Sequence, residues 1–312
     1  MRTPRRALLL TAGLAITGLT LSACSSSDGG GGSDDGISVL ASFYPLQYIA
    51  QQVGGDHVSV SSLTPPGAEP HDLELSPSQV NSLGQADLVV YLSDFQAAVD
   101  EAVDANPPSH VVNAADDVTL HAAEHSEEEH EDEGEEEHDH GSTDPHFWLN
   151  PTLLPKVADD VAAALGEIDP DHAEEFTANA AAFATSMDEL DQRYTEGLAT
   201  CQERTIVTTH EAFGYLAEQY DLTQVGISGV DPEAEPSPAR VREISQLVQD
   251  EGVSTIFFET LASPKVAETL ADDLGVQTAV LDPIEGLTDD TQDYLSIADA
   301  NLESLRTALS CS

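Results

Sequence analysis

From Ile37 onward, short runs of apolar residues alternate with longer stretches in which apolar residues recur every three or four positions. The short runs predict strands, and the periodic stretches predict amphipathic helices. We expect strands at 37–42, 58–63, 87–92, 110–113, 205–208, 223–227, 255–258 and 277–281. We expect helices at 45–53, 77–83, 95–105, 211–220, 238–250, 264–274 and 291–309. Such alternation predicts an α/β fold with two lobes, each a mostly parallel four-stranded sheet flanked by helices.

A long helical stretch separates the two groups of strands. It opens with Asp169 as a helix cap and Pro170 at the first helical position. Apolar residues then recur at helical spacing at Ala173, Phe176, Ala180, Phe183, Met187, Leu190, Tyr194 and Leu198. We therefore expect one rigid linking helix at 169–199, between an N-terminal lobe at 37–168 and a C-terminal lobe at 200–312.

The N-terminus carries an export signal. Residues 1–23 combine a positive start with a short apolar stretch and small residues before Cys24. The sequence Leu21-Ser22-Ala23-Cys24 resembles a bacterial lipobox, in which the Cys is lipidated; a plain signal peptide with a chance Cys is the alternative. Residues 24–36 then predict a flexible tether. We expect a lipid-anchored protein outside the cytoplasmic membrane, at the cell surface or in the periplasm.

Charge and cysteine content narrow the function further. The chain has 58 acidic and 10 basic residues, and a formal net charge of −48, which argues against nucleic-acid binding. After Cys24 only Cys201 and Cys311 remain, and an exported chain with two cysteines predicts one disulfide. A metal site made by the two cysteines is the alternative. We expect a monomer.

An acidic, histidine-rich segment interrupts the first half of the chain. It contains His121, His125, His130, His138 and His140 among many carboxylates and very few apolar residues. This composition predicts a disordered loop at 121–143. The histidines predict an auxiliary metal-holding role, and a solubilising acidic loop is the alternative.

Four further residues are candidate metal ligands. His71 and His146 lie in the first half, and His210 and Asp282 follow predicted strands of the second half. Ligands of open α/β sheets bind beyond the carboxyl ends of the strands, so one site between the lobes can gather all four. Three imidazoles and one carboxylate suit Zn²⁺, whereas Ca²⁺ and Mg²⁺ prefer oxygen ligands. The wide spacing of these residues matches no short zinc motif.

The residues around these positions resemble a known family. Gly67-Ala68-Glu69-Pro70-His71-Asp72, Asp144-Pro145-His146-Phe147-Trp148-Leu149-Asn150-Pro151 and His210-Glu211-Ala212-Phe213-Gly214-Tyr215 are similar to the ligand loops of metal-specific substrate-binding lipoproteins of ABC importers, the cluster A-I family. The segment from Gly226 to Ser237 is similar to a further family signature, and the resemblance extends from about residue 37 to the C-terminus.

The resemblance implies a function and a metal. It implies a protein that binds Zn²⁺ and delivers it to the permease of an ABC-type importer. Zinc-binding members have His at the third ligand position, as in His210, and manganese-binding members tend to have Glu. Some relatives use an Asp at the position of Asp282 as fourth ligand, and others use a carboxylate beside the first His, or water. Pro70 occupies that neighbouring position here, so Asp282 is the expected ligand.

Three other functions remain as alternatives. A manganese-binding member of the same family and a surface adhesin are both compatible with a lipid-anchored chain. A zinc hydrolase would need a general base near the metal, for which only Glu211 and Glu259 are candidates. No His-Glu-x-x-His sequence is present. We therefore expect a protein that is not an enzyme. Because zinc requires neutral imidazoles, we expect its affinity to fall as the pH drops through the range near 6.5.

Overall fold

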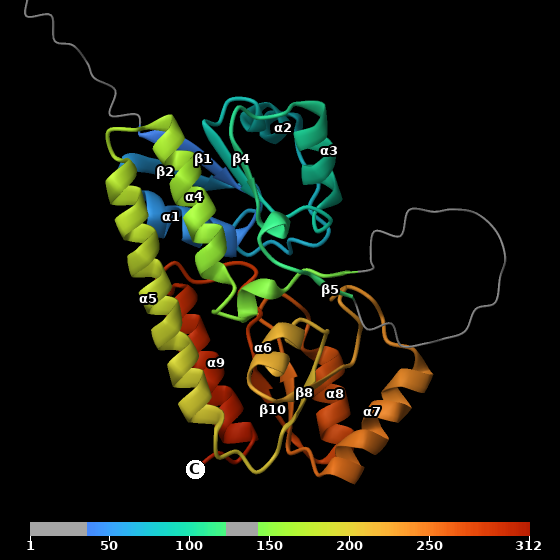
Figure 1. The fold of residues 1–312 in the computed structure, drawn as a ribbon. Coiled ribbons are helices and arrows are strands. Elements are labelled where there is room, and N and C mark those ends of the chain that lie inside the picture. Colours follow the sequence, from blue (N-terminus) through green and yellow to red (C-terminus); the bar gives the residue numbers. More distant parts are fainter. Residues whose placement is uncertain (1–35, 123–142) are drawn as a thin grey trace, which may run out of the picture. The chain divides into compact units, whose positions relative to one another are not determined.

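Two four-stranded sheets form the framework of this protein, whose computed structural model describes residues 36–122 and 143–312 (Figure 1). The first sheet has the order β2-β1-β3-β4 and contains β1 (Ile37–Ala41), β2 (Val58–Ser62), β3 (Leu88–Tyr91) and β4 (Val111–Asn113). The second has the order β10-β9-β7-β8 and contains β7 (Thr205–Thr208), β8 (Thr223–Gly226), β9 (Thr255–Phe258) and β10 (Gln277–Val280). All neighbouring strands in both sheets are parallel. The two sheets share one topology, and the predicted α/β fold is confirmed.

Helices cover these sheets and connect their strands. They are α1 (Tyr44–Gly54), α2 (Pro77–Leu83), α3 (Ala97–Ala105), α4 (Leu154–Ile168), α5 (Ala173–Leu198), α6 (Gly214–Gln219), α7 (Pro238–Glu251), α8 (Lys265–Leu274) and α9 (Tyr294–Ala308). Helix α4 and the short antiparallel pair β5 (His121–Ala122) and β6 (Thr143–Asp144) are absent from the sequence-based prediction. The buried positions of α4 nevertheless have helical spacing, as Leu154, Val157, Val161 and Leu165 illustrate.

Helix α5 passes along both halves of the structure (Figure 1). Its 26 residues span about 39 Å at the usual helical rise. It packs against α1 and α4 beside the first sheet and against α9 beside the second. Seven of the eight apolar positions predicted for it are buried, and one hydrophobic core continues from one half to the other. The linking helix begins at Ala173 rather than Asp169, which instead follows the last residue of α4.

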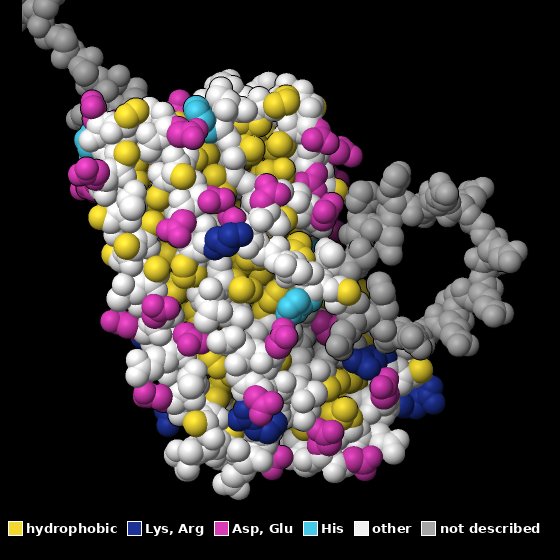
Figure 2. All heavy atoms as spheres, viewed as in Figure 1, with side chains coloured by type: hydrophobic (Ala, Val, Ile, Leu, Met, Phe, Trp, Pro, Cys, Tyr) yellow, Lys and Arg dark blue, Asp and Glu magenta, His cyan; other side chains and the backbone are white. Residues whose placement is uncertain are grey.

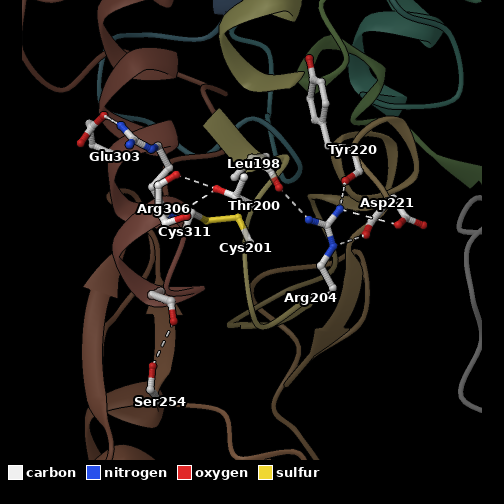
Figure 3. Close-up of a disulfide and its surroundings, with 12 residues drawn as sticks. Leu198, Thr200, Cys201, Arg204, Tyr220, Asp221, Ser254, Glu303, Arg306 and Cys311 are labelled. Carbon is white, nitrogen blue, oxygen red and sulfur yellow. Dashed lines mark hydrogen bonds and ion pairs between the residues drawn. A yellow bond between two sulfur atoms is a disulfide. The ribbon is translucent and has the colours of Figure 1, made fainter. Parts of the chain in front are cut away.

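The predicted disulfide between Cys201 and Cys311 is present (Figure 3). It joins the segment after α5 to the C-terminal end of α9, across a sequence separation of 110 residues. Hydrogen bonds reinforce this junction, because Thr200 donates to the Ser312 carbonyl and Arg204 donates to the Leu198 carbonyl. The end of the chain is therefore fastened to the end of the linking helix.

The described residues, 36–122 and 143–312, belong to one compact unit. The lobe boundaries near 168 and 200 remain a prediction. Among the described residues, no helix combines the length and the apolar character needed to cross a membrane.

Candidate metal centre

Four side chains from separate loops converge beside the two sheets. His71 lies in the loop after β2, His146 precedes the 3₁₀ helix η3 (Phe147–Leu149), His210 follows β7 and Glu285 follows β10. Each offers one ligand atom, and these atoms all lie within 4.8 Å of one another. In the second sheet β8 and β9 lie on opposite sides of β7, so the order in which strands are added reverses between β7 and β9. The loops after these strands border the position where α/β sheets bind ligands.

The spacing of the four ligand atoms fits one small ion. Glu285 Oε1 lies 2.8 Å from His146 Nε2, 3.3 Å from His71 Nε2 and 3.6 Å from His210 Nε2. The Nε2 atoms of His146 and His210 are 3.3 Å apart. Four ligands held about 2.0–2.1 Å from one tetrahedral ion lie about 3.3–3.4 Å from one another. Four of the six separations among these atoms, 2.8–3.6 Å, are thus close to those of a tetrahedral zinc site.

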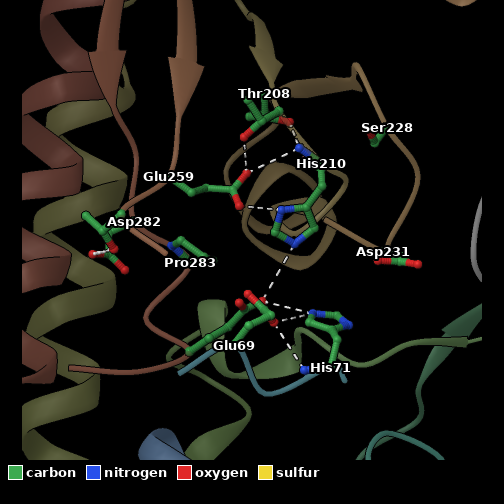
Figure 4. Close-up of polar contacts among 12 residues, drawn as sticks. Glu69, His71, Thr208, His210, Ser228, Asp231, Glu259, Asp282 and Pro283 are labelled. Atoms are coloured by element: carbon green, nitrogen blue, oxygen red, sulfur yellow. Dashed lines mark hydrogen bonds and ion pairs between the residues drawn. The ribbon is translucent and has the colours of Figure 1, made fainter. Parts of the chain in front are cut away.

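Two further carboxylates orient the imidazoles. Asp144 Oδ1 lies 2.7 Å from His146 Nδ1. Glu259 Oε2 lies 2.6 Å from His210 Nδ1, as Figure 4 shows. Glu259 also accepts hydrogen bonds from the Thr209 hydroxyl and from the His210 backbone N–H. A carboxylate that accepts the Nδ1–H of a histidine leaves the Nε2 lone pair free for a metal. Both side chains therefore prepare their histidines for coordination through Nε2.

Aromatic rings pack against His71 and His146, the two histidines that come from the first half of the chain. The His71 ring packs edge-on against Phe95 at 4.8 Å, and the His146 ring lies 5.1 Å from Trp148. Phe43 contacts both aromatic rings and is fully buried. His146 and His210 are also fully buried, whereas the His71 side chain is 12% exposed. The site is therefore enclosed, and His71 lies on its accessible side.

Burial and charge shift the pKa values in opposite directions. Burial would lower the pKa of His210, but the charge and hydrogen bond of Glu259 outweigh it and raise this pKa to about 10. Burial would also lower the pKa of His146, but the hydrogen bonds and charges of Asp144 and Glu285 outweigh it and raise this pKa. At His71 burial prevails and lowers the pKa. Burial would raise the pKa of Glu285, but hydrogen bonds from the three histidines hold it well below its usual value.

A fourth carboxylate, that of Glu69, lies beside His71. Glu69 accepts the backbone N–H of His71 at 3.1 Å. Burial and the nearby charge of Glu285 raise the pKa of the Glu69 carboxyl to about 7. Its side chain is 18% exposed, whereas that of Glu285 is 1% exposed.

The structure corrects the predicted fourth ligand. Asp282 is outside the cluster, and Figure 4 shows its carboxylate pointing away from His71 and His210. Its two oxygens accept hydrogen bonds from the Thr260 hydroxyl and the Ile284 backbone N–H instead. The carboxylate that completes the cluster is Glu285, three residues further along the same turn. Glu285 was not predicted, because the choice of Asp282 followed from the resemblance, in which some relatives use an Asp at that position, and from its place after the strand.

The auxiliary histidines fall mostly outside the described residues. His125, His130, His138 and His140 lie outside them, as does the predicted lipidation site Cys24. His121 is described, and it lies apart from the four-residue cluster. Its ring stacks on Tyr215 at 3.9 Å, and its Nε2 atom lies 3.1 Å from the carboxylate of Glu218.

The two candidates for a general base are engaged in other contacts. Glu259 holds the Nδ1 side of His210, which is the side away from the cluster. Glu211 lies 3.6 Å from Arg240. Neither belongs to the four-residue cluster.

The fold and the site together define a metal-binding protein, in which loops from two parallel sheets build one three-histidine, one-carboxylate centre. Residues 39–308 match the family described as "Zinc-uptake complex component A periplasmic", and the chain belongs to this family. The family consists of transport components rather than enzymes, which agrees with the prediction that the chain is not an enzyme.

Individual relatives support this assignment. The chain is 36% identical over 307 residues to the high-affinity zinc uptake system protein ZnuA of Bacillus subtilis, covering 95% of this chain and 96% of that protein. It is 36% identical over 299 residues to the zinc-binding lipoprotein AdcA of Streptococcus pneumoniae, covering 94% of this chain. This chain spans only 59% of the length of the Streptococcus pneumoniae AdcA and 55% of the length of the zinc-binding protein AdcA of Streptococcus pyogenes.

A solved structure with the same fold is the laminin-binding protein Lmb of Streptococcus agalactiae, described as a bifunctional protein with adhesin and metal-transporting activity. Its TM-score is 0.78 at 34% sequence identity, covering 88% of this chain and all of that one.

Proposed function

We propose that this protein binds Zn²⁺ outside the cytoplasmic membrane through His71, His146, His210 and Glu285, and delivers the ion to an ABC-type zinc importer. The observation that carries this proposal is the cluster of three imidazole nitrogens and one carboxylate oxygen, which all lie within 4.8 Å of one another. The relatives named as zinc uptake and zinc-binding proteins support the same cargo.

The donor set favours zinc over manganese. Three nitrogen ligands and one oxygen form the four-coordinate shell that Zn²⁺ accepts without a geometric penalty. Mn²⁺ is better served by carboxylate, carbonyl and water ligands. The enclosing aromatic residues Phe43, Phe95 and Trp148 also leave little room for additional waters on that side. Manganese binding is the alternative cargo that the experiment below tests.

The surface charge favours collection of a cation. Acidic side chains are scattered over the face seen in Figure 2, while basic ones are few, and the chain carries a formal net charge of −48. A field of this sign raises the local concentration of cations. We infer that the histidine-rich segment, with His125, His130, His138 and His140, adds weak and transient ligands, and that lipidation of Cys24 keeps the protein beside its importer.

Metal analysis and competition binding test the proposal. Protein purified without added metal should contain zinc, and a chelator competition should give a tighter dissociation constant for Zn²⁺ than for Mn²⁺. His210→Ala should abolish tight binding. His172→Ala is the matched control, because His172 also has a carboxylate partner, Asp169, but lies outside the cluster. Equal zinc affinity in the two variants, or tighter binding of Mn²⁺, would contradict the proposed site or cargo.

Delivery requires a separate test. A strain that lacks this protein should grow poorly in zinc-depleted medium, and the wild-type gene should restore growth while the His210→Ala form should not. The zinc-loaded protein should also co-purify with the permease of a zinc importer. Restoration of growth by His210→Ala would contradict a transport role for the site.

Adhesion is a second candidate, favoured by the similarity to the laminin-binding protein of Streptococcus agalactiae. An adhesin should bind immobilised laminin, and this binding should survive both metal chelation and His210→Ala. Absence of laminin binding by the zinc-loaded protein would remove this candidate.

A further inference from the structure

The turn that carries Glu285 has an unfavourable backbone conformation. Ile284, the residue before Glu285, has a φ angle of 58°. This left-handed region is costly for a β-branched residue, because its Cβ substituents crowd the backbone. Ile284 is also 1% exposed, so it has no freedom to relax into solvent. Such a conformation persists only where the surrounding structure enforces it.

The side chain of Asp282 holds this turn from within. Its Oδ1 atom accepts the backbone N–H of Ile284 at 2.8 Å, which closes the turn two residues ahead. Its Oδ2 atom accepts the hydroxyl of Thr260 at 2.7 Å. The backbone of Asp282 is fixed by Asn301, whose side-chain amide accepts its N–H at 2.8 Å and donates to its carbonyl at 2.7 Å. Asp282 is therefore fixed at both its backbone and its carboxylate.

Trp148, from the first half of the chain, also forms a hydrogen bond to this turn. The indole N–H of Trp148 donates to the carbonyl of Pro283 at 2.7 Å. The Trp148 carbonyl in turn accepts the hydroxyl of Tyr294 on α9. Trp148 also lies against His146, so this contact links the Glu285 turn to one of the metal-binding imidazoles.

We propose that Asp282 is a positioning residue for the metal site, which acts by holding Ile284 in its left-handed conformation and so aims Glu285 at the three imidazoles. This inference rests on the proposed function. Without the Asp282 carboxylate, the Ile284 N–H loses its partner and the turn relaxes. The direction in which residue 285 leaves the backbone then changes, and its carboxylate moves away from the cluster. Three imidazoles remain, with water as the fourth ligand.

The conservative variant separates positioning from coordination. In Asp282→Asn, the side-chain oxygen still accepts the Ile284 N–H and the amide can donate to the Thr260 hydroxyl. An asparagine therefore keeps the turn, but it lacks the anionic oxygen that a zinc-ligating carboxylate supplies. Asp282→Ala removes both contacts. Asp289→Ala is the matched control, since Asp289 accepts the N–H and hydroxyl of Thr291 in a similar turn that is exposed and remote from the ligands.

The experiment measures zinc affinity by chelator competition, together with the visible absorption of the Co²⁺-loaded protein. Asp282→Ala should weaken zinc binding by about 10–100-fold, as expected when a supporting side chain is lost from a metal site. Its Co²⁺ absorption should also fall, because a site in which water replaces Glu285 loses its fixed four-coordinate geometry. Asp282→Asn should recover most of the affinity, and Asp289→Ala should bind as the wild type does.

Three outcomes would overturn the inference. Equal zinc affinity in Asp282→Ala and Asp289→Ala would show that the turn does not position Glu285. Equal losses of zinc affinity in Asp282→Asn and Glu285→Gln would indicate that Asp282 is itself a ligand. An Asp282→Ala protein with weakened zinc binding but an unchanged Co²⁺ spectrum would indicate a general structural effect. Failure of the wild-type protein to bind zinc at all is a different result, which contradicts the proposed function instead.

A second variant covers the case in which Asp282→Ala does not fold. Thr260→Val keeps the shape of an exposed side chain and removes only the hydroxyl that Asp282 accepts. It should weaken zinc binding several-fold and change the Co²⁺ spectrum in the same direction, with no loss of the zinc-free thermal transition. Wild-type affinity and spectrum in Thr260→Val would then overturn the inference.

Discussion

Zinc binding should expel protons from the histidines even above neutral pH. The pKa of His210 is raised to about 10 and that of His146 is also raised, so both imidazoles carry a proton in the metal-free protein at pH 7 to a greater extent than free histidine does. Zinc needs the Nε2 lone pair of each, and therefore binds only when the protons leave. His71, whose pKa is lowered, contributes no proton.

The magnitude follows from the number of protons released. For each proton expelled, zinc affinity rises about tenfold per pH unit, which is about 1.4 kcal/mol. If only His210 releases a proton, zinc affinity therefore rises about tenfold between pH 7 and 8. If His146 releases one as well, zinc affinity rises by up to about a hundredfold over the same range. Three unperturbed imidazoles would instead give an affinity that levels off above about pH 7.5. Because the pKa values of His210 and His146 are raised, zinc affinity should depend on pH above the range near 6.5 that was expected from the sequence.

Calorimetry can count these protons. Zinc titrations at about pH 8 in two buffers of different ionisation enthalpy should show release of at least one proton per ion. A chelator competition, corrected for the pH dependence of the chelator, should show affinity still rising between about pH 7.5 and 8.5. A flat affinity over this range with no proton release would refute the reasoning.

The raised pKa of His210 should also make the stability of the zinc-free protein depend on pH. Because the folded-state pKa of His210 lies above its unfolded value of 6.5, protonated His210 stabilises the fold below about pH 6.5, and this contribution is lost as the pH rises through about 10. The thermal midpoint of zinc-free protein should fall over this range more than that of His210→Gln. A larger fall in the variant would contradict the assignment.

Three further predictions concern single features of the structure. Glu259→Ala should weaken zinc binding by about 10–100-fold, because His210 loses the carboxylate that orients its ring, and Glu259→Gln should lose less; this is measured by chelator competition. Deleting residues 123–142 should reduce zinc affinity far less than His210→Ala does, and equal losses would assign the main site to that segment. Reducing the Cys201–Cys311 disulfide should lower the free energy of unfolding by about 2–5 kcal/mol in a denaturant titration, without changing zinc affinity.

Much of the fold could be predicted because its elements have strong local signals. The strands at Thr205–Thr208 and Thr255–Phe258 are short apolar runs, and the structure places them at the predicted residues. The long helix α5 has an apolar stripe of constant spacing. Its start at Ala173 was harder to predict, because Asp169 and Pro170 have the chemistry of a helix start and yet lie between α4 and α5.

The ligand set could be predicted only in part for a physical reason. His71, His146 and His210 have distinctive neighbours in the sequence, and they do converge. The choice between Asp282 and Glu285 depends on the left-handed backbone at Ile284, which redirects the chain after β10 and which sequence composition does not reveal.

The role of Glu259 and Asp144 as partners of the imidazoles was not predicted, since Glu259 was considered only as a general base. Glu259 directly follows the buried strand β9, and Asp144 lies two residues before His146. Both positions had a detectable local pattern. Their partnership with particular Nδ1 atoms depends on loop geometry that only the folded chain shows.

X-ray absorption at the zinc edge, on protein loaded with one equivalent of Zn²⁺, reports the ligands of the bound ion. It should show a four-coordinate ion with three imidazole nitrogens and one carboxylate oxygen at about 2.0–2.2 Å, and His210→Ala should change the spectrum. A six-coordinate oxygen shell, or a spectrum that His210→Ala leaves unchanged, would contradict the proposed zinc site.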